Sequence, residues 1–361
     1  MSNLKLSVCI ATLNRGNFIG ATLESIICQA TEEVEIVVLD GASTDRTGEV
    51  IRRYQERFPR LRYFRQETNK GVDHDFAEAV ALARGEYCWL FSDDDLMKPG
   101  AIQTVLEAAR GQYALIIANA EVRNADLTKV LQRQRLPLSA DRIYRWSENH
   151  RLLADVGDYL SFIGCVIINR QLWDAREKER YFGSFFVHVG VIFQSPLLEN
   201  TLAIAKPLIS IRYGNAMWFD KYFEISMFKW PNLIWSLGHY PDAVKVQVCR
   251  KEPWRRIRTL LLQRAKGAYT IKAYRKWLEP RLETSLTRAA SKAIAYFPGR
   301  IANLMAVIYL SAFRRRSGVL LELVDQANSP FYFCRLRKRR PVVREHHGRL
   351  NLSPEFRRND P

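Results

Sequence analysis

YCWLFSDDD, residues 87–95, is an apolar run that ends in three adjacent carboxylates, Asp93, Asp94 and Asp95. Adjacent carboxylates repel one another and lose hydration when a fold buries them, so a cation or several hydrogen-bond donors are expected beside them. A solvated turn or helix cap is the other interpretation, because Pro99 and Gly100 precede an expected helix and Asp is a common cap residue. The segment alone leaves both interpretations open.

Residues 6–109 alternate between short apolar runs and amphipathic segments. Strands are expected at 6–13, 34–39, 61–66 and 87–90, and helices at 18–30, 47–58, 73–83 and 101–109. Alternation at this spacing is typical of a parallel sheet whose strands are joined by crossover helices. We therefore expect an α/β fold with a Rossmann-like, mostly parallel sheet flanked by helices.

Polar side chains follow all four expected strands, at Asn14, Asp40, Asn69 and residues 93–95. Ligands of such sheets bind beyond the carboxyl ends of the strands, so this coincidence predicts a polar crevice there. No GxGxxG follows the first strand, and no GxxxxGK[ST] occurs in the sequence. Neither a dinucleotide-binding fold nor a P-loop nucleotidase is therefore supported.

The net charge of +17 is unevenly distributed along the 361 residues. Residues 1–244 carry 28 Lys and Arg against 30 Asp and Glu, whereas residues 245–361 carry 27 against 8. The sequence predicts a slightly acidic domain at 1–244, followed by a basic, mainly helical extension at 245–361. The length and the 47% apolar content suit one large or two ordinary domains.

Six cysteines, at positions 9, 28, 88, 165, 249 and 334, show no close pairing, as is typical of free thiols in a reducing cytosol. Residues 1–13 lack the apolar region and cleavage site of a signal peptide. No stretch reaches the roughly 18 uninterrupted apolar residues of a membrane-spanning helix, and the longest candidate, 301–313, is too short. These features predict a cytoplasmic protein.

Short apolar stripes alternate with cations from residue 254 onward. Helices are expected at 254–267, 286–297 and 301–316, with arginine clusters at 314–316 and within 335–340. Cationic amphipathic helices bind anionic membranes, each basic residue contributing roughly 1 kcal/mol. A solvated basic face is the alternative, and no recognised motif supports a third interpretation, nucleic-acid binding. We therefore expect an anionic membrane surface, and no nucleic acid, as a partner.

Four segments are characteristic: residues 7–15 (SVCIATLNR), 37–47 (VVLDGASTDRT), 69–72 (NKGV) and 85–100 (GEYCWLFSDDDLMKPG). In these segments the chain resembles the GT-A glycosyltransferases of family 2, inverting enzymes that use nucleotide-diphosphate sugars. Residues 158–170 (DYLSFIGCVIINR) and 212–218 (RYGNAMW) resemble the abequosyltransferase-like branch, which adds sugars to bacterial surface polysaccharides. The resemblance implies a GT-A fold, with a nucleotide-sugar half at about 1–110 and an acceptor half at about 111–244.

By this resemblance Asp40 hydrogen-bonds the base of the nucleotide, and residues 93–95 form the DxD-type site. A diphosphate enters an acidic crevice only with a divalent cation, and hard oxygen ligands select Mg²⁺ or Mn²⁺. The resemblance assigns the metal to Asp94, helped by Asp93, which faces the ribose or the metal. Ser92 departs from the usual first Asp of the motif, and Asp95 is a supporting or capping group. The donor site implied in full is Thr12, Asn14, Arg15, Asp40, Asn69, Lys70, Gly71, Asp93 and Asp94.

The catalytic base has no clear counterpart. Family members commonly supply an Asp that takes the proton of the acceptor hydroxyl, but the corresponding residues 181–194 (YFGSFFVHVGVIFQ) contain no carboxylate. His188 is our candidate base and also a candidate metal ligand, although a lone His in an apolar stretch is commonly a core residue. Asp158 and Asp155 are alternative bases, or else loop or helix caps.

Asn215 and Trp218 are expected near the acceptor or in the core, and Arg212 near the diphosphate. Together these features predict a metal-dependent inverting glycosyltransferase that uses a nucleotide-diphosphate sugar and a saccharide or polyprenyl-linked acceptor. Its expected role is bacterial surface polysaccharide biosynthesis, in the cytoplasm and peripheral on the inner face of the cell membrane. The alternatives are a sugar nucleotidyltransferase, which normally opens with a glycine-rich loop absent here, and a non-catalytic nucleotide-sugar-binding protein.

Overall fold

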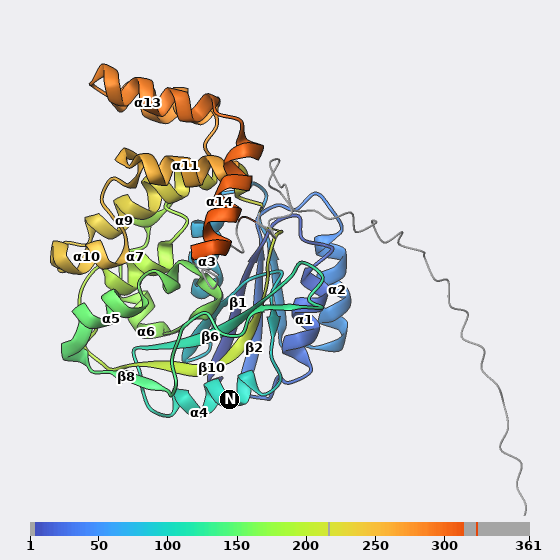
Figure 1. The fold of residues 1–361 in the computed structure, drawn as a ribbon. Coiled ribbons are helices and arrows are strands. Elements are labelled where there is room, and N and C mark those ends of the chain that lie inside the picture. The colour runs from blue at the N-terminus through green and yellow to red at the C-terminus, as the bar shows by residue number, and fades with distance from the viewer. Residues whose placement is uncertain (1–3, 216, 314–322, 324–361) are drawn as a thin grey trace, which may run out of the picture.

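A computed structural model describes residues 4–215, 217–313 and 323 (Figure 1). In this part of the chain one mixed sheet of ten strands has the main order β3-β2-β1-β4-β9-β6-β10-β5, with β7 on β6 and β8 on β10. The strands are β1 (Leu6–Thr12), β2 (Val34–Asp40), β3 (Leu61–Arg65), β4 (Tyr87–Phe91), β5 (Leu96–Met97), β6 (Leu115–Arg123), β7 (Val130–Gln132), β8 (Arg142–Tyr144), β9 (Val166–Asn169) and β10 (Thr201–Arg212).

The α-helices of the same residues are α1 (Ile19–Ile27), α2 (Thr47–Arg57), α3 (Val72–Leu82), α4 (Ala101–Ala109), α5 (Asn149–Val156), α6 (Arg170–Asp174), α7 (Val187–Phe193), α8 (Tyr222–Glu224), α9 (Trp230–Ser236), α10 (Asp242–Val248), α11 (Ile257–Ala265), α12 (Ile271–Ala273), α13 (Ser285–Tyr296) and α14 (Gly299–Phe313). All eight elements expected in residues 6–109 are present, with ends that differ by a few residues. The prediction of a strand and helix alternation is therefore confirmed.

β1 lies at the centre of the parallel half of the sheet, between β2 and β4. The register pairs Thr12 with Asp40 on one side and Ile10 with Phe91 on the other. β3 pairs in parallel with β2 at the edge. This register places the loop after β1 between the loops that follow β2 and β4, and those loops contain the predicted site.

Helices cover both faces of this half, which is why every residue of β1 and β2 is buried (Figure 1). Alternate strand residues enter two cores. Val8 and Ile10 pack in the core that includes α1, α2 and α4, whereas Cys9 and Ala11 pack with α3 and with helices of the second half. Because helices cover both faces, β1 and β2 are apolar along almost their whole length.

The second half of the sheet is mixed rather than parallel. β9 runs antiparallel to both of its neighbours, β4 and β6, and β5 runs antiparallel to β10. β10 is parallel to β6 with a register shift at Pro207, a residue that cannot donate a backbone hydrogen bond. The carboxyl end of β10 reaches Arg212 and leads the chain back to the acidic segment after β4.

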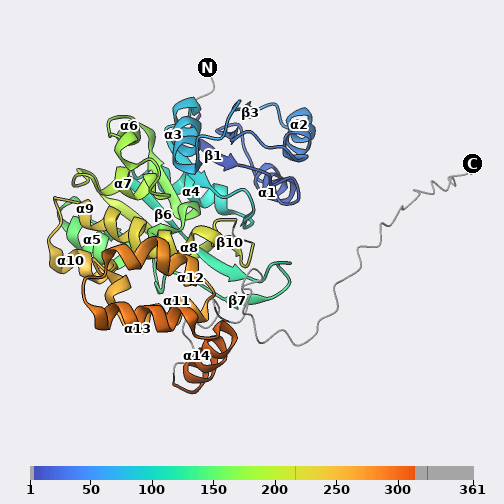
Figure 2. The ribbon, with the colours of Figure 1, turned by 90° about the horizontal axis from the view of Figure 1, so that it is seen from above.

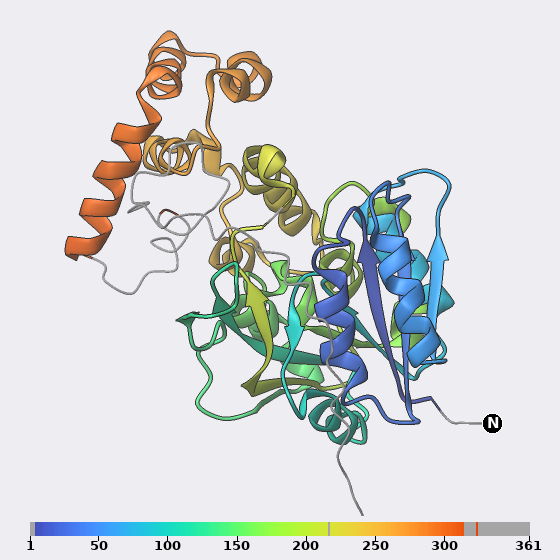
Figure 3. The same cartoon turned by 90° about the vertical axis from the view of Figure 1, so that its right-hand side faces the viewer.

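Residues 223–228 and the helices from residue 253 onward share a separate core beside the sheet (Figures 2 and 3). This core joins Phe223 and Phe228 to Trp254, Tyr269 and other residues of the C-terminal helices, whereas α9 and the end of α10 pack in the core of the sheet. The helices expected at 254–267 and 286–297 are present, and so is the described part of the one expected at 301–316. The arginine clusters lie outside the described residues.

Two further expectations concern thiols and membrane spans. The five cysteines within the described residues are free, as expected. Among the described helices none alone has the length and apolar composition to cross a bilayer, although α13 and α14 together pass that test as a pair bent by 93°.

The close approach of β4 to β1 gives a stability prediction. A Cβ at Gly85 would lie 2.7 Å from the Ser7 backbone nitrogen and 2.8 Å from the Leu6 carbonyl carbon. Gly85→Ala should therefore push apart the start of β4 and β1, and should lower the free energy of unfolding by about 1–3 kcal/mol in urea titration. Gly238→Ala is the matched control, because nothing lies within 4 Å of its Cβ position. Equal stabilities of the two variants would contradict this packing.

Candidate active site

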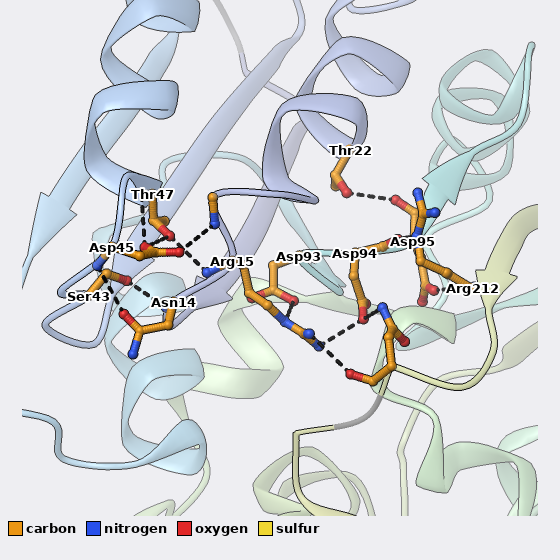
Figure 4. Close-up of polar contacts among 12 residues, drawn as sticks. Asn14, Arg15, Thr22, Ser43, Asp45, Thr47, Asp93, Asp94, Asp95 and Arg212 are labelled. Atoms are coloured by element: carbon orange, nitrogen blue, oxygen red, sulfur yellow. Dashed lines mark hydrogen bonds and ion pairs between the residues drawn. The ribbon is translucent and has the colours of Figure 1, made fainter. Parts of the chain in front are cut away.

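The loops that follow β1 and β2 are joined by Asn14 (Figure 4). Asn14 has a φ of 54°, a left-handed conformation that Asn tolerates better than most residues. Its backbone nitrogen donates to Ser43 Oγ at 2.8 Å, and its Oδ1 accepts from the Thr44 backbone nitrogen at 2.7 Å. The predicted donor-site residue Asn14 thus shapes the loop from which the next residue projects.

Asp45 makes the second connection between these loops (Figure 4). Its Oδ2 accepts from the Gly16 backbone nitrogen at 3.0 Å, and its Oδ1 accepts from the backbone nitrogen and hydroxyl of Thr47. Burial opposes ionisation, but these hydrogen bonds outweigh it and lower the pKa of Asp45. Thr47 Oγ1 in turn accepts from the Arg15 backbone nitrogen at 2.8 Å, so the backbone of Arg15 is held on one side by the β2 loop.

The side chain of Arg15 extends to the acidic segment after β4 (Figure 4). Its Nε lies 3.2 Å from Asp93 Oδ1, and its NH2 lies 2.8 Å from Asp94 Oδ2. NH1 donates to the Asn215 carbonyl at 3.2 Å. Arg15 is 11% exposed and each carboxylate is 13% exposed, so the pairing is partly desolvated but open to a ligand.

Asp94 receives a second donor from the far end of β10. Asn215 Nδ2 donates to Asp94 Oδ2 at 2.7 Å, the same oxygen that Arg15 contacts. We expected Asn215 near the acceptor or in the core, and the structure places its side chain on Asp94. The loop after β10 therefore completes the acidic site together with the loops after β1 and β4.

Asp95 faces away from Arg15 and supports the loop. Its Oδ1 accepts from the Arg212 backbone nitrogen at 2.8 Å, and its carbonyl accepts from Thr22 Oγ1 at 2.9 Å (Figure 4). Arg212 also donates from Nε to the Asp94 carbonyl at 3.0 Å. Asp95 is 3% exposed, and burial together with the neighbouring Asp94 raises its pKa well above the usual range.

Burial dominates the electrostatics of the two accessible carboxylates. It raises the pKa of Asp93 to about 7, with Asp94 adding to the shift and Arg15 opposing it. Burial also raises the pKa of Asp94, against the effects of Arg15 and Asn215. One guanidinium therefore does not fully compensate the two acids, and an additional cation would stabilise their ionised forms.

The donor set fits a divalent cation that arrives with phosphate. Asp93 and Asp94 offer hard oxygens, and Mg²⁺ commonly binds through one or two carboxylates plus substrate phosphates. Within the described ranges there is no group of three His, Cys, Asp or Glu residues that could hold a metal ion. A cation held here would therefore have two protein carboxylates as ligands and would take its other ligands from substrate or water.

Asp40 lies at the end of β2, next to a pocket of about 560 Å³. Its Oδ1 accepts from the Ser43 backbone nitrogen and its Oδ2 from the Tyr63 hydroxyl, both at 2.7 Å. The pocket is lined by Tyr63, Gln66, Lys70 and neighbouring residues of β3 and its loop. The predicted base-binding residue is therefore fully buried behind Tyr63, which itself reaches the pocket.

The remaining predicted donor-site residues lie in two places. Thr12 is buried at the end of β1, and its carbonyl accepts from the Gly41 backbone nitrogen at 2.9 Å. Asn69, Lys70 and Gly71 form an exposed turn before α3, in which Asn69 Oδ1 accepts from the Gly71 backbone nitrogen at 2.8 Å. Gly71 has a φ of 95°, a conformation that favours glycine.

Asp75, in the first turn of α3, is a residue that the sequence did not single out. It is 4% exposed, and its Oδ2 lies 2.7 Å from the position of a Cβ on Gly41. Burial and the nearby Glu78 raise the pKa of Asp75 to about 6, and its Oδ1 has no hydrogen-bond partner among the described residues. Acidic residues are common in the first turn of a helix, where they interact favourably with the helix dipole, so the sequence did not mark Asp75 as unusual.

The candidate bases do not join this cluster. His188 is 1% exposed, its Nε2 lies 2.7 Å from the Leu160 carbonyl oxygen, and burial lowers its pKa to about 4. Asp155 pairs with Arg142 at 3.0 Å on the surface of α5. Asp158 is exposed just beyond the same helix. The structure thus brings Arg15, Asp93 and Asp94 together but leaves these three residues on other elements.

A carboxylate from elsewhere reaches the loop where the family's base was expected. Asp73 accepts from the backbone nitrogens of Phe185 at 2.8 Å and Val187 at 3.0 Å, and it is 5% exposed. Phe185 has a φ of 72°. Lys229 donates to the Gly183 carbonyl in this loop and lies 3.6 Å from Glu224. Sequence reasoning missed both contacts because they join residues far apart in the chain.

The mixed sheet flanked by helices, with polar loops at the carboxyl ends of its parallel strands, is an α/β fold that solved structures share. The structure resembles S. aureus TarS 1-349 in complex with UDP, with a TM-score of 0.53 and 16% identity over 86% of this chain and 93% of that one. Its complex with UDP-GlcNAc gives a TM-score of 0.51 at 14% identity, over 85% and 92% of the two chains. The fold is therefore GT-A, as predicted.

Sequence comparison shows the family. A model of the family "Glycosyl transferase family 2" matches residues 7–171. The chain is 30% identical to abequosyltransferase RfbV of Salmonella typhimurium over 228 residues, 58% of this chain and 67% of that protein. It is 32% identical over 116 residues, 32% of this chain and 38% of the relative, to the GalNAc(5)-diNAcBac-PP-undecaprenol beta-1,3-glucosyltransferase of Campylobacter jejuni. This protein belongs to glycosyl transferase family 2.

The predictions of the family, the fold and a glycosyltransferase activity are therefore confirmed. A sugar nucleotidyltransferase and a non-catalytic binding protein, the two alternatives, are not supported by these relatives.

The raised pKa of Asp93 predicts a pH-dependent stability. The folded protein holds a proton on Asp93 up to pH about 7, whereas an unfolded Asp loses it near pH 4, so stability falls as the pH rises through this window. Asp93→Asn should leave the metal-free protein almost unchanged at pH 4 and stabilise it at pH 8, by an amount on the order of 1 kcal/mol. Urea titration with a chelator present measures both values. A variant that is less stable than wild type at pH 8 would count against the assigned pKa.

The contact of Arg15 with both acids predicts competition with a metal. Arg15→Met should bind Mn²⁺ more tightly in the absence of nucleotide, by roughly tenfold, because the cation no longer competes with a charge-assisted hydrogen bond. Nucleotide diphosphate should bind this variant more weakly. Isothermal titration measures both affinities, and Arg53→Met, an exposed arginine on α2, is the control. Unchanged Mn²⁺ affinity would show that Arg15 does not occupy the cation position.

Proposed function

We propose that this protein transfers a sugar, with inversion, from a nucleotide-diphosphate sugar to a saccharide or polyprenyl-linked acceptor in bacterial surface polysaccharide biosynthesis. The observation that supports it is the pair of accessible carboxylates, Asp93 and Asp94, which faces Arg15 at the carboxyl edge of a family 2 sheet. Two acids and one guanidinium can bind a diphosphate only if a further cation balances the charge.

Asp94 and Asp93 would hold Mg²⁺ or Mn²⁺ in this proposal. When bound, the metal supplies charge stabilisation for the departing nucleotide diphosphate. Arg15 lies next to both acids and can turn its guanidinium from them to a phosphate oxygen, since Arg recognises both groups through the same donors. Asn215 keeps the Asp94 carboxylate oriented, because it contacts the oxygen that Arg15 would release.

The nucleotide is proposed to enter the pocket beside β3. Tyr63 forms one polar wall and is held by the buried Asp40 behind it, and Lys70 lines the same pocket from the segment before α3. Thr12, Asn14, Asn69 and Gly71 shape the backbone around it. The resemblance to RfbV supports a nucleotide sugar as the donor, but the base and the sugar are open to test.

A carboxylate is the better proposal for the general base. His188, with its pKa near 4 and its Nε2 on a carbonyl, is neutral and sealed in the core at neutral pH. Asp158 is exposed, and Glu224 reaches the loop of Gly183 through Lys229. Asp158→Asn and Glu224→Gln distinguish the two, because only loss of the base should remove the acidic limb of the pH profile of transfer.

The proposed place of action is the inner face of the cell membrane. The Campylobacter relative is named for an undecaprenol-linked acceptor, and a polyprenyl-linked acceptor would confine this enzyme to a lipid surface. The excess of cations in residues 245–361 supports an anionic membrane as a partner. Residues 1–244 would then be the catalytic domain and 245–361 the region that associates with the membrane.

Asp94→Asn is the decisive variant for this proposal. Losing one metal-binding carboxylate should reduce transfer and donor hydrolysis by roughly 100-fold or more, while the fold is retained. The donor is first identified from a panel of nucleotide sugars by thermal stabilisation, since binding to the native state raises its stability. Turnover with Mn²⁺ and with chelator is then compared for the two proteins.

Asp242→Asn, which removes a carboxylate that is 77% exposed on α10, is the matched control and should remain active. Full activity of Asp94→Asn would overturn the metal assignment. Activity of the wild type in chelator would overturn metal dependence while leaving the transferase in place.

A further inference from the structure

α14 presents an apolar face to solvent. Ile301, Met305 and Ile308 lie on successive turns along one side of the helix, and they are 48%, 60% and 59% exposed. Their spacing of i, i+4 and i+7 places them on a common face of the helix. Figures 2 and 3 show α14 at the margin of the molecule, on the side away from β1 and α2. We call these three residues the α14 stripe.

The opposite face of α14 is fixed to the protein. Ala302 and Leu310 are buried in a small core with Ala265 of α11, and Asn303 Nδ2 donates to the Ala265 carbonyl at 3.0 Å. Asn303 is 1% exposed. The α14 stripe is therefore held outward by a packed helix and does not result from a loose one.

α13 precedes α14 and meets it at a bend of 93°. Tyr296, at the end of α13 next to α14, is 52% exposed, and Leu286 at the far end is 80% exposed. The cations Arg288, Lys292 and Arg300 of the same two helices are also exposed. Both helices thus expose apolar and cationic side chains.

The net charge around the α14 stripe indicates which kind of partner could bind there. Residues 245–313 carry 15 Lys and Arg against three Asp and Glu, a net charge of +12. Residues 314–361 carry 12 against five, so the rest of this chain is itself basic, and a second copy that docks through the same region would present the same charge. Both are electrostatically unfavourable occupants. Nucleic acid would match the charge but offers no apolar phase for the α14 stripe.

We propose that the α14 stripe and the adjoining end of α13 are the docking surface for an anionic phospholipid bilayer. A bilayer supplies both required chemistries, anionic headgroups for the cations and an acyl boundary for the apolar side chains. The inference deepens the proposed function and rests on it for its biological role, because a lipid-linked acceptor would lie in that bilayer. The docking itself is a separate physical property.

Flotation of the full-length protein with vesicles tests the proposal. Wild type should float with vesicles of phosphatidylcholine and phosphatidylglycerol at low salt, should be released by high salt, and should not float with phosphatidylcholine alone. The variant Ile301→Ser, Met305→Ser, Ile308→Ser should lose roughly tenfold or more in vesicle affinity, because it keeps the charge but not the apolar contact. Leu198→Ser, which removes an 82% exposed leucine from another surface, should bind as wild type does.

Several results would overturn the inference. These are absence of wild-type flotation, flotation of the triple variant at wild-type affinity, and a dimer in sedimentation velocity that the triple variant disrupts. Equal affinity for a DNA duplex in wild type and variant, with no vesicle binding, would assign the charge to nucleic acid instead. Thermal unfolding checks that the triple variant is folded, and exposed serines should leave its melting temperature near that of wild type.

Donor hydrolysis in the absence of lipid separates this inference from the proposed function. The triple variant should hydrolyse donor at the wild-type rate, because its changes lie outside the acidic site. If wild type floats with vesicles but does not hydrolyse the donor, the enzymatic proposal alone would be overturned. Retained hydrolysis without flotation would overturn the docking surface alone.

Discussion

The contact between one guanidinium and two adjacent carboxylates is the constraint on which the acidic site depends. Asp93 and Asp94 are each 13% exposed, and side by side they would be costly to ionise without Arg15. Arg15 can reach both only because β1 is paired directly with β4, in a register that brings the ends of the two strands together. Strand order therefore places the guanidinium that favours the ionised forms of the two acids.

The other loops can be understood as the means of holding Arg15. Asn14 adopts a left-handed conformation and binds the β2 loop, while Asp45 and Thr47 bind the backbone on either side of Arg15. Hydrogen bonds therefore fix the base of the side chain, and its tip remains partly exposed beside Asp94. A cationic tip on a rigid base suits a group that exchanges a carboxylate for a phosphate, since little conformational freedom is lost on binding.

The sequence predicted the parallel half of the sheet well, because its strands are short, apolar and separated by amphipathic helices of ordinary length. The family motifs likewise predicted where Asn14, Arg15 and Asp94 would lie, since each follows a strand. Asn215 and Asp73 could not be placed this way. Asn215 contacts an oxygen 121 positions away in the chain, and Asp73 caps a loop 112 and 114 positions away. No local pattern encodes such partners.

Asp73 connects α3 to a loop far along the chain. It lies in the first turn of α3, after the segment Asn69, Lys70 and Gly71, and it fixes the loop before α7, where Phe185 has a left-handed backbone. Burial raises the pKa of Asp73, and the backbone donors of Val187 and Phe185 oppose that shift. These hydrogen bonds favour the ionised carboxylate and hold the loop in place. Residues 181–194 contain no carboxylate of their own, and the buried Asp73 of α3 stabilises this loop. Under the proposed function the base is therefore sought on other elements, at Asp158 ahead of β9 or at Glu224 after β10.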